Sequence, residues 1–150
     1  MEKPSRSLTI LLADDSEDDR LMTREALHDT LEFNELREVE DGEELMNYLL
    51  HSGPYADPAS APVPNLILLD LNMPRKSGYE ALQDIKAHPV LKRIPVVVFS
   101  TSSDEEDVVR SYDLGVNSFI TKPMTFDAFA KVMKTFGDYW IKTVATPPVG

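Results

Sequence analysis

An apolar run that stops at a single carboxylate constrains this chain more than any other segment. The run Leu66–Leu69 ends at Asp70, and turn-forming proline and glycine residues follow soon after. A short, wholly apolar run of this kind is typical of a buried parallel strand, whose carboxyl end lies at the edge where open α/β sheets bind ligands. A second run, Leu8–Ala13, ends the same way in Asp14 and Asp15. Two neighbouring strands would therefore bring three carboxylates to one edge.

Segments typical of strands and of helices alternate five times along the chain. The predicted strands are Leu8–Ala13, Leu36–Val39, Leu66–Asp70, Pro95–Phe99 and Ser118–Thr121. The predicted helices are Ser16–Thr30, Gly42–Leu50, Gly78–Ala87, Asp104–Leu114 and Thr125–Val144. This alternation implies βαβ crossovers and a parallel sheet with helices on both faces. We therefore predict one α/β domain over residues 8–144, between short tails at 1–7 and 145–150.

Composition excludes several classes of function. The 150 residues include 15 Lys and Arg against 26 Asp and Glu, so the formal net charge is −11 and a nucleic acid would be repelled. The absence of cysteine excludes disulfides, thiolate catalysis and zinc–thiolate sites. No apolar run reaches the length of a membrane span. The apolar run near the amino terminus is too short to be the core of a signal peptide. These features predict a cytoplasmic protein with no membrane partner.

The three strand-end carboxylates have an ordinary interpretation and a chemical one. Aspartate favours turns and helix starts, so Asp14, Asp15 and Asp70 could serve only as caps. If they converge, however, two carboxylates about 4 Å apart repel by roughly 4 kcal/mol at an effective dielectric near 20. Three are stable together only when one is protonated or a cation binds, and hard oxygen ligands favour Mg²⁺. The nearby Asp18 and Asp19 are interpreted as solvated helix residues without a role.

Two further strands end in polar groups. Ser100 and Thr101 close the fourth strand, where a hydroxyl ordinarily caps the next helix. Lys122 and Pro123 close the fifth, and a lone surface lysine is ordinarily solvated. At the same edge as three carboxylates, however, Lys122 would neutralise their charge or anchor an incoming anion.

With these residues in place, the chain resembles the receiver domains of two-component response regulators over about residues 8–143. Ser100 lies 30 positions after Asp70, and Lys122 lies 22 positions after Ser100, as in chemotaxis-type receivers. The phrase Asp-Leu-Asn-Met-Pro at 70–74, followed by Gly78, matches the phosphoacceptor loop of that family. The resemblance implies a flavodoxin-like doubly wound (βα)5 fold with a five-stranded parallel sheet in the order 2-1-3-4-5.

The resemblance also implies roles for the acidic residues. Asp70 would be the phosphoacceptor, a carboxylate nucleophile that takes a phosphoryl group from a histidine kinase or a small phosphodonor. Asp15, Asp70 and the backbone carbonyl of Asn72 would bind Mg²⁺ directly, with Mn²⁺ as a substitute. Asp14 would act on the metal through water.

The remaining implied roles concern the phosphoryl group and the conformational switch. Lys122 would contact the phosphoryl oxygens, and Ser100 would be the switch hydroxyl that bonds to them. Phe119, 19 positions after Ser100, lies where the family carries its switch aromatic residue. Pro123 would follow a cis Lys122–Pro123 peptide bond, an isomer that is common only before proline.

A subset of the family resembles the chain more closely, namely single-domain response regulators associated with bacterial phytochromes. The shared features are the long loop 52–65, residues 65–72, residues 91–98 and an aromatic carboxyl-terminal helix. The loop is interpreted as a tolerated surface insertion, because lengthening a loop costs little, with a binding loop as the alternative. The resemblance implies a histidine kinase partner, a phytochrome among the candidates. Because the sequence ends after the fifth helix, we expect output through a partner, a dimer or a further relay step.

The last helix carries an apolar stripe that predicts packing on the sheet. Its members are Phe126, Phe129, Met133, Phe136 and Trp140. Tyr139 and Trp140 near its end are candidate dimer contacts. We predict a homodimer formed through this helix or through the face made by the fourth helix, fifth strand and fifth helix.

Two alternative functions are considered from the same residues. A metal-dependent phosphohydrolase would also use Asp70 as nucleophile, but such enzymes often carry a second aspartate two residues later, where this chain has Asn72. A flavodoxin-like cofactor binder would need a phosphate-binding loop after the first strand, where Asp14 and Asp15 would repel phosphate. We therefore predict a phosphorylation-gated signalling protein rather than an enzyme.

Overall fold

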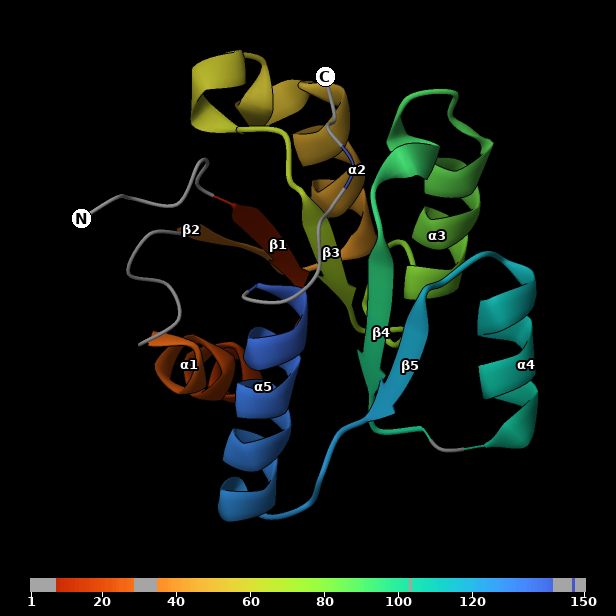
Figure 1. The fold of residues 1–150 in the computed structure, drawn as a ribbon. Helices are drawn as coiled ribbons and strands as arrows, with labels where there is room; N and C mark the ends of the chain where they lie inside the picture. Colours follow the sequence, from red (N-terminus) through yellow and green to blue (C-terminus); the bar gives the residue numbers. More distant parts are fainter. Residues whose placement is uncertain (1–7, 29–34, 103, 142–146, 148–150) are drawn as a thin grey trace.

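Five parallel strands form one sheet in the computed structural model, which describes residues 8–28, 35–102, 104–141 and 147 (Figure 1). The strands are β1 (Thr9–Ala13), β2 (Glu35–Val39), β3 (Leu66–Leu69), β4 (Val96–Ser100) and β5 (Ser118–Thr121). Their order is β2-β1-β3-β4-β5, and each neighbouring pair is parallel. The predicted flavodoxin-like doubly wound architecture is confirmed.

Helices cover both faces of this sheet. They are α1 (Glu17–Ala26), α2 (Gly42–Leu50), α3 (Gly78–Ala87), α4 (Glu105–Asp113) and α5 (Phe126–Trp140). Short 3-10 turns in the described loops include η2 (Gly53–Tyr55), η3 (Pro58–Ser60) and η4 (Leu91–Arg93). In Figure 1, α1 and α5 lie together on one face and α2, α3 and α4 on the other. Because all five strands are parallel, their carboxyl ends lie at the same edge of the sheet.

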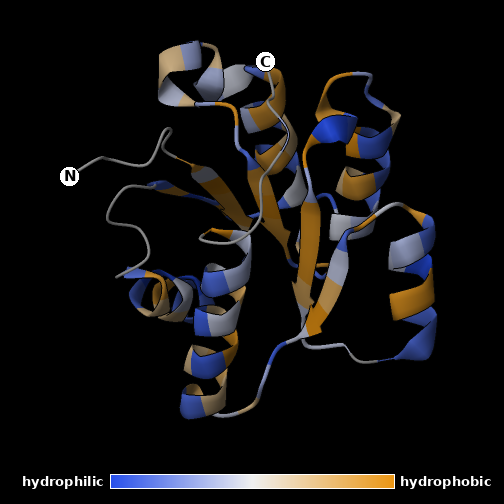
Figure 2. Cartoon of the chain, viewed as in Figure 1, coloured by the Kyte–Doolittle hydropathy of each residue, from blue (hydrophilic) through white to orange (hydrophobic). Residues whose placement is uncertain are grey.

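The buried centre explains why the strands are so apolar. Every residue of β3 and β4 is buried, because helices cover the two central strands from both sides. Leu11, Ile67 and Val98 belong to the core beneath α2 and α3, whereas Ile10 and Leu68 belong to the core beneath α1 and α5. Burying one such side chain stabilises a fold by about 1.5–3 kcal/mol. Figure 2 shows this separation as apolar strands surrounded by helices with hydrophilic outer faces.

Several predicted boundaries lie outside the described residues. Helix α1 ends at Ala26 with Leu27 as its C-cap, and the predicted end at Thr30 lies outside the described residues. Helix α5 ends at Trp140, and the predicted end at Val144 lies outside the described residues. So do both predicted tails, 1–7 and 145–150, apart from residue 147.

One member of the predicted apolar stripe does not pack on the sheet. Phe129, Met133 and Phe136 are buried and Trp140 packs at the edge of the core, but Phe126 is 60% exposed. Phe126 is the first residue of α5, and α5 begins beyond the carboxyl edge of the sheet (Figure 1). No strand lies beneath it there, so the stripe begins one turn later.

The insertion loop 52–65 is bonded to α2 rather than left extended. The hydroxyl of Tyr48 donates to the carbonyl of Pro62 at 2.7 Å, and the hydroxyl of Tyr55 donates to Glu44 at 2.6 Å. Tyr48 and Glu44 both belong to α2, and Glu44 lies in its first turn. Among the described residues, no helix combines the length and the apolar character needed to cross a membrane.

Candidate functional site

The ends of β1 and β3 bring the predicted acidic residues together. The backbone N–H of Asp70 donates to the carbonyl of Ala13 at 2.9 Å, so the two strands are still paired where their carboxylates begin. One carboxylate oxygen from each of Asp14, Asp15 and Asp70 lies within 4.8 Å of the others. Asp14 and Asp70 are buried and Asp15 is exposed. The expected convergence of three carboxylates therefore occurs at the carboxyl edge.

Lys122 lies within this cluster. Its Nζ donates to Asp14 Oδ2 at 2.7 Å, to Asp19 Oδ2 at 2.8 Å and to Asp70 Oδ2 at 3.3 Å. The side chains of Lys122, Asp14 and Asp70 are only 4%, 2% and 8% exposed. One buried ammonium thus faces three carboxylates, which leaves an excess of negative charge at the site.

Asp19 was the residue that sequence reasoning missed. We expected it to be solvated and without a role, but it is a direct partner of Lys122. It lies in the first turn of α1, which follows β1 at the same edge and is acidic throughout. The sequence shows only that the first turn after the strand-end Asp14 is acidic, and this pattern does not distinguish Asp19 from Glu17 or Asp18.

Burial alters the ionisation of the buried groups. Desolvation raises the pKa of Asp70 to about 6, with Asp14 adding to the effect and Lys122 opposing it. Desolvation likewise raises the pKa of Asp14. Burial alone would lower the pKa of Lys122, but Asp14 and Asp19 outweigh it and raise the pKa above its usual value. The site therefore favours a protonated lysine and resists carrying two buried negative carboxylates.

The donor set fits a hard divalent cation. Three carboxylates from two strand ends supply only oxygen ligands, the type that Mg²⁺ and Mn²⁺ take in proteins. Burial raises the pKa values of Asp14 and Asp70, so a cation bound beside them would favour their ionised forms. Asn72 is exposed beside them, and its backbone N–H donates to Asp70 Oδ1 at 3.3 Å.

Helix caps fix the positions of the site segments. Asp14 Oδ1 accepts from the backbone N–H of Ser16 at 2.9 Å, and Ser16 Oγ accepts from the N–H of Asp19 at 3.1 Å. At the start of α3, Ser77 and Glu80 form a reciprocal capping box. Such caps contribute about 1 kcal/mol each to stability and hold the chain where it enters the helix.

Two glycines let the loop after β3 approach its neighbours. The N–H of Gly78 donates to the carbonyl of Leu71, and a Cβ at Gly78 would lie 2.3 Å from the backbone oxygen of Asp70. The N–H of Gly42 donates to the carbonyl of Lys76, and a Cβ there would lie 2.1 Å from that oxygen. Any larger residue would displace the loop, so only glycine fits at both positions.

An ion pair supports the strained turn of the same loop. Arg75 has a φ of 65°, a left-handed conformation that costs a non-glycine residue on the order of 1–3 kcal/mol. Its Nε donates to Asp41 Oδ2 at 2.9 Å. Asp41 is buried at the start of α2, and although burial opposes it, hydrogen bonds from the Glu44 backbone and Arg75 lower its pKa.

The candidate switch residues lie beside the site on β4 and β5. Ser100 is fully buried, and its carbonyl accepts from the backbone N–H of Lys122 at 2.7 Å. Its Oγ accepts from the backbone N–H of Ser102 at 3.3 Å, which leaves the hydroxyl proton available to an acceptor. Phe119 pairs in register with Val98 and packs, partly buried, against the core beneath α2 and α3.

The expected cis Lys122–Pro123 bond is not found. No cis peptide bond occurs among the described residues, so this bond is trans. The trans isomer is the lower in energy before proline by about 0.5–1 kcal/mol. In this arrangement, Lys122 already reaches all three of its carboxylate partners.

The fold and the site together define a class of signalling protein. A model of the response regulator receiver domain matches residues 10–134. The chain therefore belongs to the response regulator receiver family. The phosphohydrolase alternative has no support from this match.

Individual relatives share both the sequence and the shape. Response regulator Rcp1 of Synechocystis sp. is 43% identical over 138 residues, which cover 92% of each chain. The crystal structure of the Mn(2+)-bound form of Rcp1 has a TM-score of 0.88 and 42% identity, over 94% of this chain and 99% of that one. The structure of the phosphorylated cyanobacterial phytochrome response regulator RcpA has a TM-score of 0.89 and 43% identity, over 95% and 99%.

Proposed function

We propose that this protein is a stand-alone response regulator that accepts a phosphoryl group on Asp70 in a Mg²⁺-dependent reaction. The observation that carries the proposal is the contact of one buried lysine, Lys122, with both Asp14 and Asp70. Such a cluster supplies a nucleophilic carboxylate, a cation for the phosphoryl oxygens and an acidic metal site within one edge of the sheet.

In the proposed reaction, a carboxylate oxygen of Asp70 attacks the phosphorus of phosphohistidine or acetyl phosphate. The bond from phosphorus to the donor nitrogen or oxygen breaks, and the leaving group keeps the electron pair. The product is an acyl phosphate on Asp70. The acyl phosphate replaces the single charge of the carboxylate with up to two phosphoryl charges, so the transfer adds negative charge that the site must neutralise.

Positive charge at the site would stabilise the transferring group. Asp15, Asp70 and the backbone carbonyl of Asn72 would hold the metal, with Asp14 acting through water. A bound Mg²⁺, or Mn²⁺ in its place, supplies charge neutralisation and orientation of the phosphoryl oxygens. Lys122 would exchange part of its contact with Asp70 for a contact with the new phosphoryl group.

The test is direct phosphorylation of the full chain. With Mg²⁺ and acetyl phosphate, we expect a hydroxylamine-labile adduct of one phosphoryl group, located at Asp70 by mass spectrometry of peptides. Asp70→Asn should give no adduct, whereas Asp18→Asn, which removes an exposed carboxylate of the same edge, should label like the wild type. Equal labelling of Asp70→Asn would refute the assignment.

Phosphorylation would change the surface through Ser100 and Phe119. The Ser100 hydroxyl has a proton to donate, and an acyl phosphate at Asp70 would present oxygens that accept it. Drawing the segment after β4 inward would let Phe119 take up the vacated space. The extent of the change is limited by the difference in contacts between the two states.

The proposed phosphodonor is a histidine kinase, and a phytochrome is the specific candidate because RcpA is described as a phytochrome response regulator. The protein would act in the cytoplasm, with no nucleic acid or membrane partner, and would turn over no substrate beyond its own phosphoryl group. The net charge of −11 is consistent with a protein partner rather than a polyanion.

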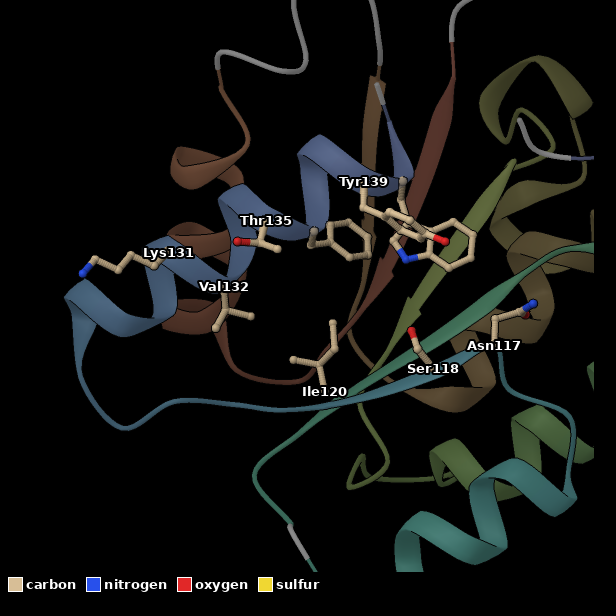
Figure 3. A pocket seen from close by; sticks show the side chains of 9 residues that line it. Asn117, Ser118, Ile120, Lys131, Val132, Thr135 and Tyr139 are labelled. Carbon is tan, nitrogen blue, oxygen red and sulfur yellow. The ribbon is translucent and has the colours of Figure 1, made fainter. Parts of the chain in front are cut away.

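We also propose that the protein forms a homodimer through α5 and the face that α5 shares with α4 and β5. A largely apolar groove of about 740 Å³ lies between β5 and α5, with Ile120 and Val132 in its wall and Tyr139 at its rim (Figure 3). Tyr139 is 56% exposed and packs edge-to-face on Trp140, with ring centroids 5.5 Å apart. Exposed aromatic residues around an apolar groove favour a protein contact.

Truncating Tyr139 should weaken this dimer. We expect Tyr139→Ala to raise the dimer dissociation constant about 10-fold or more, because buried aromatic anchors dominate interface energies. Leu50→Ala is the control, since Leu50 is a similarly exposed apolar residue on α2, outside the proposed dimer face. Sedimentation velocity over a concentration series measures both. Equal dissociation constants for the two variants would remove Tyr139 from the interface.

A further inference from the structure

A hydrogen-bond network joins the loop after β4 to α3 and α4. Asp107, in the first turn of α4, accepts from the hydroxyl of Ser102 through Oδ2 and from the hydroxyl of Tyr79 through Oδ1, the latter at 2.6 Å. Tyr79 lies in α3, and the guanidinium carbon of Arg110 lies 4.0 Å from the centre of its ring. α3 and α4 lie next to each other on one face of the sheet in Figure 1. Asp107 therefore connects three separate segments.

The network does not serve as an ordinary helix cap. An acidic residue three positions after the N-cap usually reaches back to the N-cap backbone. Asp107 holds that position relative to Asp104, yet both of its oxygens are used by hydroxyls from outside the helix. Hydrogen bonds from Ser102 and then Tyr79 lower the pKa of Asp107, which keeps it an anionic acceptor at neutral pH. The carboxylate is thus used to hold the loop and α3 rather than α4 alone.

Ser102 connects this network to the candidate switch. Its backbone N–H donates to Ser100 Oγ at 3.3 Å, and its own hydroxyl donates to Asp107. Movement of Ser100 toward a phosphoryl group on Asp70 would pull on the residue that Asp107 holds. Because a single residue, Thr101, separates Ser100 from Ser102 along the backbone, inward movement of Ser100 would stretch or break the Ser102–Asp107 bond.

We propose that Asp107, with Tyr79, is a latch that holds the β4–α4 loop in the unphosphorylated position and so limits the fraction of molecules that adopt the phosphorylated conformation. The proposal rests on the function proposed above. Asp107 is a positioning residue, because it acts through Ser102 and Ser100 and does not touch Asp70. Releasing the latch would also free the first turn of α4, one border of the proposed dimer face.

Weakening the latch should tighten binding of a phosphoryl mimic. A ligand that binds only one conformer has an apparent affinity reduced by the scarcity of that conformer. The probe is beryllofluoride with Mg²⁺, titrated against the full chain and followed by amide NMR shifts. We expect Tyr79→Phe, which keeps the ring and the Arg110 contact, to bind beryllofluoride about 5-fold more tightly, the equivalent of one hydrogen bond of ~1 kcal/mol. Asp107→Asn and Ser102→Ala should act in the same direction.

A matched control separates the latch from the change in charge. Glu106→Gln removes the same charge from the same helix turn at an exposed position, and it should bind beryllofluoride like the wild type. Thermal melting supplies the second readout, because a merely structural contact would lower the melting temperature of Tyr79→Phe without altering the affinity. Unchanged or weaker binding by both Tyr79→Phe and Asp107→Asn would overturn the latch. A wild-type protein that binds no beryllofluoride would instead overturn the proposed function on which the latch depends.

Discussion

Replacing Lys122 by methionine should destabilise the metal-free protein by about 3–5 kcal/mol at pH 7, the cost of leaving a buried charge unpaired. Methionine keeps much of the length of the side chain but removes the ammonium. Asp14 and Asp70 would then be buried together without a cation, and Asp19 would lose its partner. Urea denaturation at pH 7, with and without Mg²⁺, measures the loss. We expect Mg²⁺ to restore much of it, because a divalent cation supplies the missing positive charge.

Lys86 provides the matched control. Lys86 is partly buried, and burial lowers its pKa, but its Nζ donates to the carbonyls of Lys92 and Ile94 rather than to a carboxylate. Lys86→Met should therefore cost less than Lys122→Met and show no dependence on Mg²⁺. If the two variants lost equal stability and responded equally to Mg²⁺, the carboxylate cluster would not be the reason for burying Lys122.

Acidification from pH 7 to pH 5 should stabilise the metal-free wild-type protein, and Asp70→Asn should remove much of this dependence. The pKa of Asp70 is about 6 in the folded protein, above the value of ~3.9 in an unfolded chain, so the folded state binds the proton more tightly. The stability contributed by Asp70 is therefore complete below pH 4 and is lost as the pH rises through 6. The difference corresponds to about 2–3 kcal/mol, and the raised pKa of Asp14 acts in the same direction.

At pH 7, Asp70→Asn should consequently be more stable than the metal-free wild type by about 2 kcal/mol, with no such gain near pH 4. Saturating Mg²⁺ should reduce or reverse this order, because the wild type gains about 2.7 kcal/mol at a metal concentration of 100 times the dissociation constant and the variant has lost a ligand. Asp113→Asn, which removes a charge from an exposed position on α4, should keep the wild-type slope between pH 5 and 7. A wild-type slope in Asp70→Asn would show that other groups cause the dependence.

The elements of the fold could be predicted because their signals are local. The runs that became β3 and β4 are short, apolar and bounded by turn residues, and these features alone identify buried strands. The order of the strands came from the resemblance and not from any residue pattern. The ends of α1 and α5 could not be placed from periodicity, because hydrophobic periodicity continues past the last backbone hydrogen bond of a helix.

The sequence allowed part of the site to be predicted, namely which residues lie at the same edge of the sheet. Parallel strands end at one edge, so Asp14, Asp15, Asp70 and Lys122 could be placed there without knowing any contact. The pairing of Asp19 with Lys122 could not, because the two residues are 103 positions apart and no local pattern records the direction of either side chain. The Asp107 network was missed for the same reason, since Tyr79 and Asp107 are 28 positions apart.

By itself, the amino-acid sequence determined the alternation of strands and helices, the acidic character of one edge and the membership of a family whose residues recur at known spacings. These properties follow from short-range patterns of apolar and polar residues. The tertiary structure decided which carboxylates contact Lys122, that the Lys122–Pro123 bond is trans and that Asp107 of α4 accepts a hydrogen bond from Ser102 in the loop after β4. Such contacts depend on how helices pack on the sheet, and side chains distant in the chain meet only once that packing is complete.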